Sequence, residues 1–306
     1  MRGGRKTRSA AMSSPTEAST SNDLDLVQSV LDRIAKDLAM ILDRELALSG
    51  CTAERRTERP VGADQIHISF RLGFVGATNG QGCLLLPLPE AISLAGYLMM
   101  GFGLVSFLVA GLFIHRQHDI KRLFSYSSIE HMGLMSFAFG LGGPLATFGA
   151  LLHMTVHSLT KSAIFVTVGH ASRIAGTQNM ERIRGLISTQ PNVGWGLLIG
   201  TLAIAGFPPF GVFASEFLLL SATIENWPWL AMPLLIGLAI AFAGLFRHLH
   251  PIVFGAQPEG QAPVRVNMQP VYLQLALVLW LGVAIPGFLA RWFDQATRLI
   301  TGSGLL

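Results

Sequence analysis

The chain has 306 residues, a length that suits one or two domains, and 51% of them are hydrophobic, which is a high share for a soluble protein. Its formal net charge is +4, and the basic residues of the second part lie in short connections, which argues against a nucleic-acid-binding surface. Cys51 and Cys83 have no CxxC partner or ligand cluster, which excludes an iron–sulfur or zinc centre built on cysteine.

The first ninety residues are more strongly charged than the rest. They hold eleven of the 22 Lys and Arg and eleven of the 18 Asp and Glu. Residues 1–22 are rich in Ser, Thr, Arg and Gly, a composition typical of a disordered tail. Because no apolar segment follows the basic start, we expect no secretory signal and a cytoplasmic location for this part.

A small soluble α+β module is predicted over residues 23–98. Apolar residues at helical spacing predict one amphipathic helix over 23–48. Alternating apolar and polar residues predict a half-buried strand over 65–72, and 82–86 is expected to pair with it across a Gly-rich turn at 76–82.

From residue 91 the sequence has the composition of membrane spans. Residues 91–114 carry no charge, and such a stretch is long enough to cross a bilayer core about 30 Å thick. Five further apolar runs bring the expected number of spans to about six, at 123–141, 145–170, 192–222, 229–246 and 270–290. The predicted fold class is therefore mostly α, a polytopic membrane helix bundle preceded by the α+β module.

One of these spans is expected to be broken. The run 192–222 is too long for a single straight span, and it contains Pro208 and Pro209 between Gly206 and Gly211. Proline removes backbone donors and glycine frees the dihedral angles, so the helix should be interrupted there. Broken helices at membrane depth line cavities rather than lipid.

The connections between the spans indicate the orientation. Residues 115–122, 171–190 and 247–250 are basic, whereas 141–144 and 225–229 contain no Lys or Arg. The positive-inside rule places the basic side in the cytoplasm, as for a multi-pass protein of the inner (plasma) membrane. This orientation would put residues 1–90 outside without an export signal. Either 91–114 does not span as a simple helix, or the two parts did not evolve together.

A polar stripe in the run 145–170 is the strongest functional feature. His153, His157 and Lys161 lie four residues apart and form a stripe about 12 Å long on one face of a helix. Ionisable residues inside spans are energetically unfavourable and usually functional. Imidazoles titrate near neutral pH and a lysine in a low dielectric can be neutral, so the stripe suits proton transfer. Alternatively, Lys161 extends to the membrane surface and the histidines only bond neighbouring helices.

Two carboxylates are further candidates for proton transfer. Glu216 follows the predicted break and suits a terminal exchange site, although a structural hydrogen bond to the broken helix is the alternative. Glu130, beside His131, lies one to two turns into the run 123–141 and suits a relay, or an ion pair near the cytoplasmic surface.

Other kinds of site are not expected. The histidine pairs at 115–118 and 248–250 lack a supporting carboxylate or cysteine cluster, so no metal site is predicted. The sequence has no phosphate-binding loop, nucleophile elbow or dinucleotide fingerprint. We therefore expect no catalytic residue and no cofactor in the chain itself.

Three segments resemble a known family. They are DIKRLFSYSSIEHMG at 119–133, HMTVHSLTKSAIF at 153–165 and AIAGFPPFGVFASEF at 203–217. Their order and spacing resemble the antiporter-like membrane subunits shared by respiratory complex I, multi-subunit sodium/proton antiporters and membrane-bound hydrogenases. Over about 99–300 the chain is most similar to the F-type subunits of hydrogenase-4 and formate hydrogenlyase complexes.

The resemblance implies roles for the candidate residues. It places Lys161 in a central hydrophilic axis with His153 and His157, and Glu216 at the end of a half-channel in a broken helix. Members of the family have about fourteen spans in two inverted five-helix repeats, so 99–306 corresponds to the C-terminal portion only. Residues 82–95 are similar to chemotaxis phosphatase and flagellar-switch domains of the CheC and CheX type, which implies a truncated module joined near 99–101.

The expected function follows from these features. We expect a membrane subunit of a hydrogenase-4 or complex I-like oxidoreductase, truncated, that takes part in proton translocation and has no redox centre of its own. Its partners would be other membrane subunits and the lipid bilayer, and not nucleic acid. The alternatives are a cation/proton antiporter subunit without an oxidoreductase partner, and an anchored signalling module or fusion product without function.

Overall fold

The computed structural model describes residues 67–74, 80–256 and 264–306. Strand β1 (His67–Phe74) pairs antiparallel with β2 (Gly80–Pro87), so that His67 lies opposite Pro87 and Phe74 opposite Gly80. The two strands predicted from the sequence pattern therefore form: β1 has the predicted length but lies two residues further along the chain, and β2 extends beyond the predicted 82–86 at both ends. The predicted tail at 1–22 and helix at 23–48 lie outside the described residues, and the soluble module stays a prediction.

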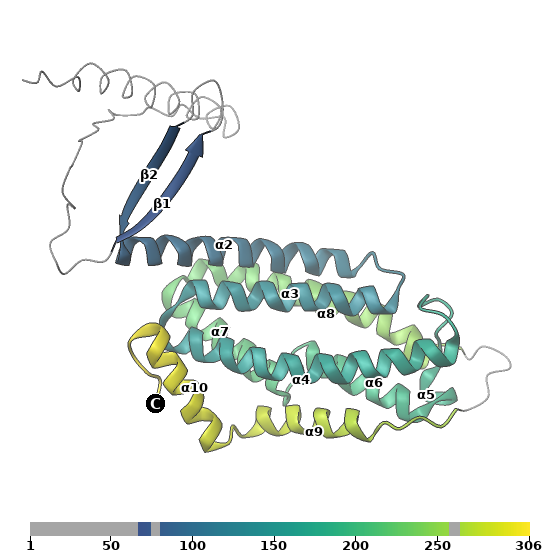
Figure 1. Cartoon of the computed structure of the whole chain (residues 1–306). Helices are drawn as coiled ribbons and strands as arrows, with labels where there is room; N and C mark the ends of the chain where they lie inside the picture. Colours follow the sequence, from purple (N-terminus) through teal and green to yellow (C-terminus); the bar gives the residue numbers. More distant parts are fainter. Residues whose placement is uncertain (1–66, 75–79, 257–263) are drawn as a thin grey trace, which may run out of the picture. The chain divides into compact units, whose positions relative to one another are not determined.

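The remaining described chain is mostly helical (Figure 1). The described helices are α2 (Leu88–Ile114), α3 (Ile120–Leu141), α4 (Gly143–Ala175), α5 (Leu186–Thr189), α6 (Pro191–Ile204), α7 (Gly211–Asn226), α8 (Ala231–Phe254), α9 (Gln269–Val283) and α10 (Gly287–Thr301), with a 3₁₀ turn at Pro228–Leu230. Helix α4 has the most central position, because it contacts α3, α6, α7, α9 and α10. Helix α2 packs along α3 and also contacts α8.

Two helices of the described part are long and apolar enough to cross a membrane, Ser93–Ile114 and Pro228–Phe254. A third would be the bent pair α9 and α10, if the two together form one span. Helices α3 and α4 have 22 and 33 residues, but both carry ionisable side chains in their middle. The expected number of six spans stays a prediction, and so does the domain boundary at 98/99, which lies inside α2.

The break predicted in the run 192–222 is confirmed. Helix α6 ends at Ile204, and α7 begins at Gly211. Gly206 between them has a φ of 68°, a left-handed conformation that glycine adopts without strain. The following Pro208 and Pro209 offer no backbone donor that could continue the helix.

The apolar run 270–290 is divided between two helices, which the sequence did not predict. Helix α9 ends at Val283 and α10 begins at Gly287, with a bend of 72° between their axes. Pro286 lies directly before α10; it lacks an N–H and disfavours the helical conformation in the residue before it. The run 270–290 is therefore not one continuous helix.

Glycines allow α2 and α3 to approach each other closely. A side-chain carbon on Gly103 would lie 2.7 Å from the carbonyl oxygen of Gly133, and one on Gly133 would lie 2.7 Å from that of Gly103. A side-chain carbon on Gly140 would lie 2.5 Å from the carbonyl oxygen of Gly96. These four residues, here called the glycine seam, leave no room for side chains between the two backbones.

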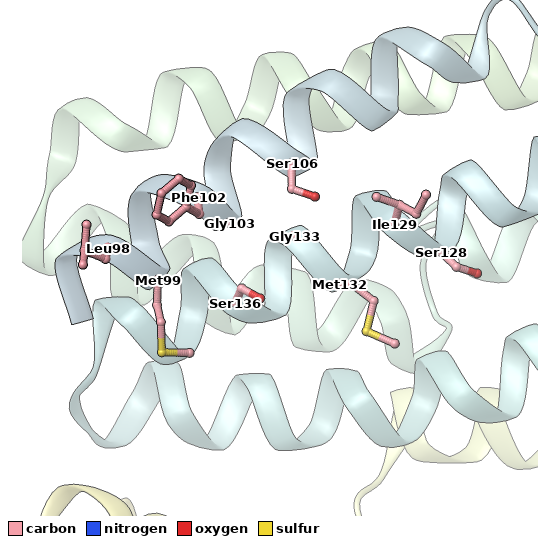
Figure 2. A pocket seen from close by; sticks show the side chains of 10 residues that line it. All are labelled: Leu98, Met99, Phe102, Gly103, Ser106, Ser128, Ile129, Met132, Gly133 and Ser136. Atoms are coloured by element: carbon pink, nitrogen blue, oxygen red, sulfur yellow. The ribbon is translucent and has the colours of Figure 1, made fainter. Parts of the chain in front are cut away.

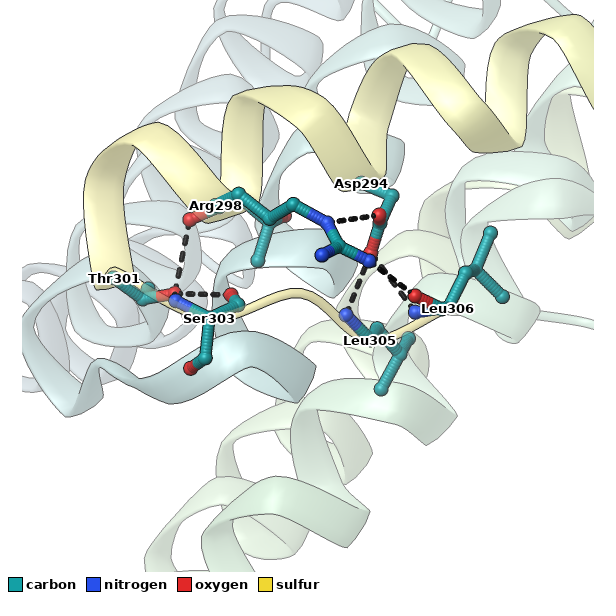
Figure 3. Close-up of polar contacts among 7 residues, drawn as sticks. Asp294, Arg298, Thr301, Ser303, Leu305 and Leu306 are labelled. Carbon is teal, nitrogen blue, oxygen red and sulfur yellow. Dashed lines mark hydrogen bonds and ion pairs between the residues drawn. The ribbon is translucent and has the colours of Figure 1, made fainter.

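The residues after α10 are held by one buried carboxylate (Figure 3). Oδ1 of Asp294 accepts hydrogen bonds from the backbone N–H groups of Leu305 at 2.6 Å and Leu306 at 2.9 Å. Its Oδ2 accepts a hydrogen bond from Nε of Arg298 at 2.7 Å. The Arg298 guanidinium also donates to the carbonyl oxygen of Leu306.

Replacing Asp294 by Ala should release this segment. Hydrogen bonds to charged groups contribute about 1.5–3 kcal/mol, so amide hydrogen exchange at Leu305 and Leu306 should rise by about tenfold or more. Exchange mass spectrometry of the chain in detergent measures this. The exposed neighbour Gln295, changed to Ala, is the control. Equal exchange in the two variants would contradict the role given to the carboxylate.

Candidate functional site

The polar stripe of α4 faces the interior of the helix bundle. His153, His157 and Lys161 are 0%, 4% and 5% exposed. The ammonium group of Lys161 donates to the carbonyl oxygen of Phe124 on α3 at 2.9 Å and lies 5.7 Å from the centroid of the Phe124 ring. Lys161 therefore does not extend to a membrane surface, whereas the other part of the alternative, histidines that bond neighbouring helices, stays open.

A third histidine, His131 of α3, completes the group. Its Nδ1 lies 3.0 Å from Nε2 of His153, and its ring centroid lies 5.0 Å from that of His157. Its Nε2 lies 3.3 Å from Oε2 of Glu130, which is also buried. His131, His153 and His157 are called the histidine cluster below. From the sequence, His131 was considered only as the neighbour of Glu130, and its place in this group was not predicted.

Ser215 of α7 sets the direction of the hydrogen bonds. Its hydroxyl donates to the carbonyl oxygen of Val212 at 2.8 Å, so its oxygen accepts from Nδ1–H of His153 at 2.9 Å. With neutral imidazoles, Nε2 of His153 then accepts from Nδ1–H of His131. Nε2 of His131 faces the Glu130 carboxyl, which can donate to it when protonated, and the backbone of Ile204 also interacts with this ring. The result is a continuous buried file made of Glu130, His131, His153 and Ser215.

Glu216 joins this group from the break in the fourth predicted span. It is 9% exposed, and a side-chain carbon on Gly206 would collide with its carboxylate. The carboxylate therefore packs against the non-helical backbone of the break. Glu216, Glu130 and His131 line one small cavity, which α8 closes with Leu238, Ala241, Phe242 and Leu245.

Several buried polar atoms of the candidate site have no hydrogen-bond partner among the described residues. They include Oε1 of Glu130, Nδ1 of His157 and Oε1 of Glu216. Buried polar atoms are nearly always paired with protein or ordered water. The cavity is small, comparable to a single water molecule, and its polar walls suit water that bridges the two carboxylates.

The histidines expected in the loops do not join the cluster. The ring of His115 lies 2.8 Å from the carbonyl oxygen of Ile240, and the ring of His250 lies against Phe254. Both contacts are with residues of α8 that have no ligand atoms of their own in the side chain. The expectation that these histidine pairs hold no metal stays a prediction.

A groove between α2 and α3 has mostly apolar walls and no side chain that could transfer a proton (Figure 2). None of the ten residues that line it is ionisable. Phe102, Ile129 and Met132 are 73%, 47% and 55% exposed, as expected of side chains that face lipid or another apolar helix. The candidate site is therefore the interior group around the histidine cluster.

Comparisons with known proteins identify the chains that this one is similar to. The sequence profile described as "NADH:quinone oxidoreductase/Mrp antiporter, TM" matches residues 82–241. The chain is 48% identical over 217 residues to the hydrogenase-4 component F homolog of Methylacidiphilum infernorum, which covers 71% of this chain and 45% of that protein. It is 33% identical over 174 residues to the D-type subunit of the Na(+)/H(+) antiporter of Alkalihalophilus pseudofirmus, over 55% of this chain and 35% of that protein.

The fold is shared with a solved respiratory complex. A chain of respiratory complex I from Thermus thermophilus with bound NADH superimposes with a TM-score of 0.64 at 24% identity, over 70% of this chain and 46% of that chain. This chain thus spans less than half the length of each of these relatives.

Proposed function

Because this chain belongs to the NADH:quinone oxidoreductase/Mrp antiporter family of polytopic membrane proteins, we propose that it takes part in proton translocation within a hydrogenase-4 or complex I-like complex. One observation carries the proposal: the buried file that links Glu130, His131, His153 and Ser215, with Lys161 and Glu216 at its sides. Buried ionisable groups are retained in membrane proteins mainly where ions or protons move.

The proposed path uses short steps between titratable groups. His157 lies one helical turn from Lys161, and its ring centroid is 5.0 Å from that of His131. From His131 the path continues to Glu130 and across the small cavity to Glu216. Lys161 and Glu216 are thus the proposed ends of the path in this chain.

The test uses an intact relative, because this chain spans 45% of the hydrogenase-4 component F homolog. Glu216→Gln at the matching position removes a proton acceptor while keeping its size. Acidification coupled to electron flow should fall by about tenfold, less than for a sole acid–base group, because Glu130 lines the same cavity. Proton release by vesicles after a pulse of electron donor gives the measurement.

The matched control is Glu225→Gln, an exposed carboxylate on the same helix α7. It should leave acidification unchanged. Normal acidification in an assembled complex that carries Glu216→Gln would contradict the proposed path.

A second candidate function is a subunit of a cation/proton antiporter without an oxidoreductase partner. The 33% identity to a D-type Na(+)/H(+) antiporter subunit supports it. Affinity purification of the protein from native membranes separates the two functions. Hydrogenase or quinone-reductase subunits in the eluate support the first, and other antiporter subunits alone support the second.

A further inference from the structure

We propose that the histidine cluster is a binding site for a divalent transition-metal ion of the zinc class. His131 and His153 come from α3 and α4 and face each other, and His157 lies one turn further along α4. One ring nitrogen from each histidine lies within 4.8 Å of the other two. Imidazole is a preferred ligand of zinc, and three histidines with an open fourth position form a known type of zinc coordination.

The geometry needs only a small adjustment. A zinc–nitrogen distance of 2.0–2.1 Å in a tetrahedral site separates two ligand nitrogens by about 3.3 Å. Nδ1 of His131 and Nε2 of His153 are 3.0 Å apart, which is close to that value. The nitrogen of His157 has to approach by at most about 1.5 Å, a shift that side-chain rotation can supply.

The surrounding groups fix the ring nitrogens as ligands. Because Ser215 accepts the Nδ1–H of His153, the lone pair of Nε2 points toward His131. When Nε2 of His131 carries the ring proton, the Glu130 carboxylate can accept a hydrogen bond from it, and the lone pair of Nδ1 is then available to a metal. A hydrogen bond from the second ring nitrogen to a hydroxyl or carboxylate is the usual support of a metal-binding histidine.

His157 supplies an independent observation. Its side chain is 4% exposed, and its Nδ1 has no hydrogen-bond partner among the residues that the structure describes. A buried ring nitrogen without a partner is unfavourable unless water or an ion binds it. A bound cation would satisfy this atom.

Two acidic side chains and one lysine lie near the cluster. Glu130 and Glu216 line the adjoining cavity, so two carboxylates lie beside the cluster. The ammonium group of Lys161 donates to the Phe124 carbonyl instead of to a histidine, so it does not occupy the ligand position. A water molecule can supply the fourth ligand.

Metal binding would have a consequence for proton transfer. Without an ion, the facing nitrogens of His131 and His153 share one proton. A bound ion replaces that proton and interrupts the buried file. This consequence rests on the proposed function, whereas binding itself does not.

The test measures zinc binding by the full chain, purified in detergent without a polyhistidine tag. Competition with a chromophoric chelator should give one zinc ion per chain. Either His157→Gln or His131→Gln should weaken zinc affinity by more than about 100-fold, beyond the effect of losing an outer-shell partner. Circular dichroism and gel filtration show which variants are folded, and two separate ligand variants keep the test valid if one is not.

The control is the double variant His118→Gln, His250→Gln, in which both replaced histidines are exposed and lie outside the cluster. Its zinc affinity should equal that of the parental chain. The proposal is overturned if the parental chain binds no zinc, if a folded cluster variant binds it equally well, or if the control variant loses it. Because no proton transfer is measured, this result is independent of the Glu216→Gln experiment.

Discussion

Replacing Lys161 by Ala should reduce acidification coupled to electron flow to below about 1% of the parental rate in an intact hydrogenase-4-type relative. Among the described residues, Lys161 is the only buried lysine or arginine on the proposed path, and its ammonium group is fixed by the Phe124 carbonyl. Vesicle acidification after a pulse of electron donor measures the effect.

Two further lysine variants sharpen this prediction. Lys161→Arg keeps the positive charge, but a guanidinium does not release its proton, so acidification should be lost again. Lys121→Ala removes the exposed lysine at the start of α3 and should have no effect. If the Lys161→Arg variant acidifies at the parental rate, the lysine acts as a fixed positive charge and not as a proton carrier. The amount of co-purified complex shows that each variant assembles.

Replacing Gly103 by Leu should prevent α2 from packing on α3. The first side-chain carbon alone would lie 2.7 Å from the Gly133 carbonyl oxygen and 2.9 Å from the Cα of Phe137. Both are backbone atoms, so no side chain can rotate to make room. Overpacking usually costs about 1–3 kcal/mol, and a forced separation of two helix backbones should exceed that range. We expect the monomer peak in gel filtration to be lost after mild heating in detergent.

Gly101→Leu is the matched control for this variant. Gly101 lies two residues earlier on α2, and a side-chain carbon there has no atom within 4 Å. This variant should keep the stability of the parental chain. Equal stability of the two variants would show that the glycine seam does not hold the helices together.

The local features of the site could be predicted from sequence because they depend on one segment at a time. The four-residue spacing of His153, His157 and Lys161 places them on one face of any helix. The prolines and glycines around Pro208 interrupt a helix whatever lies beside it. The burial of Glu216 followed from its position behind that break, although its role stays a proposal.

The convergence of side chains from different helices could not be predicted. His131 meets His153 only because α3 packs against α4, and Ser215 reaches His153 only because α7 begins after the break. One signal was available: His131 continues the buried face of α3 that includes Phe124, Ser127 and Leu134 at helical spacing. The bend before α10 was missed because apolar composition continues through Pro286.

The glycine seam has a consequence for how the protein enters its membrane. Helix α2 is apolar enough to insert alone, whereas α3 carries Glu130 and His131 in its middle, and its insertion as an isolated helix is unfavourable. The seam offers α3 a partner that is already in the bilayer and that it can approach at backbone distance. We therefore expect the two helices to insert in order: α2 enters the bilayer first, and α3 then leaves the translocon by packing against it.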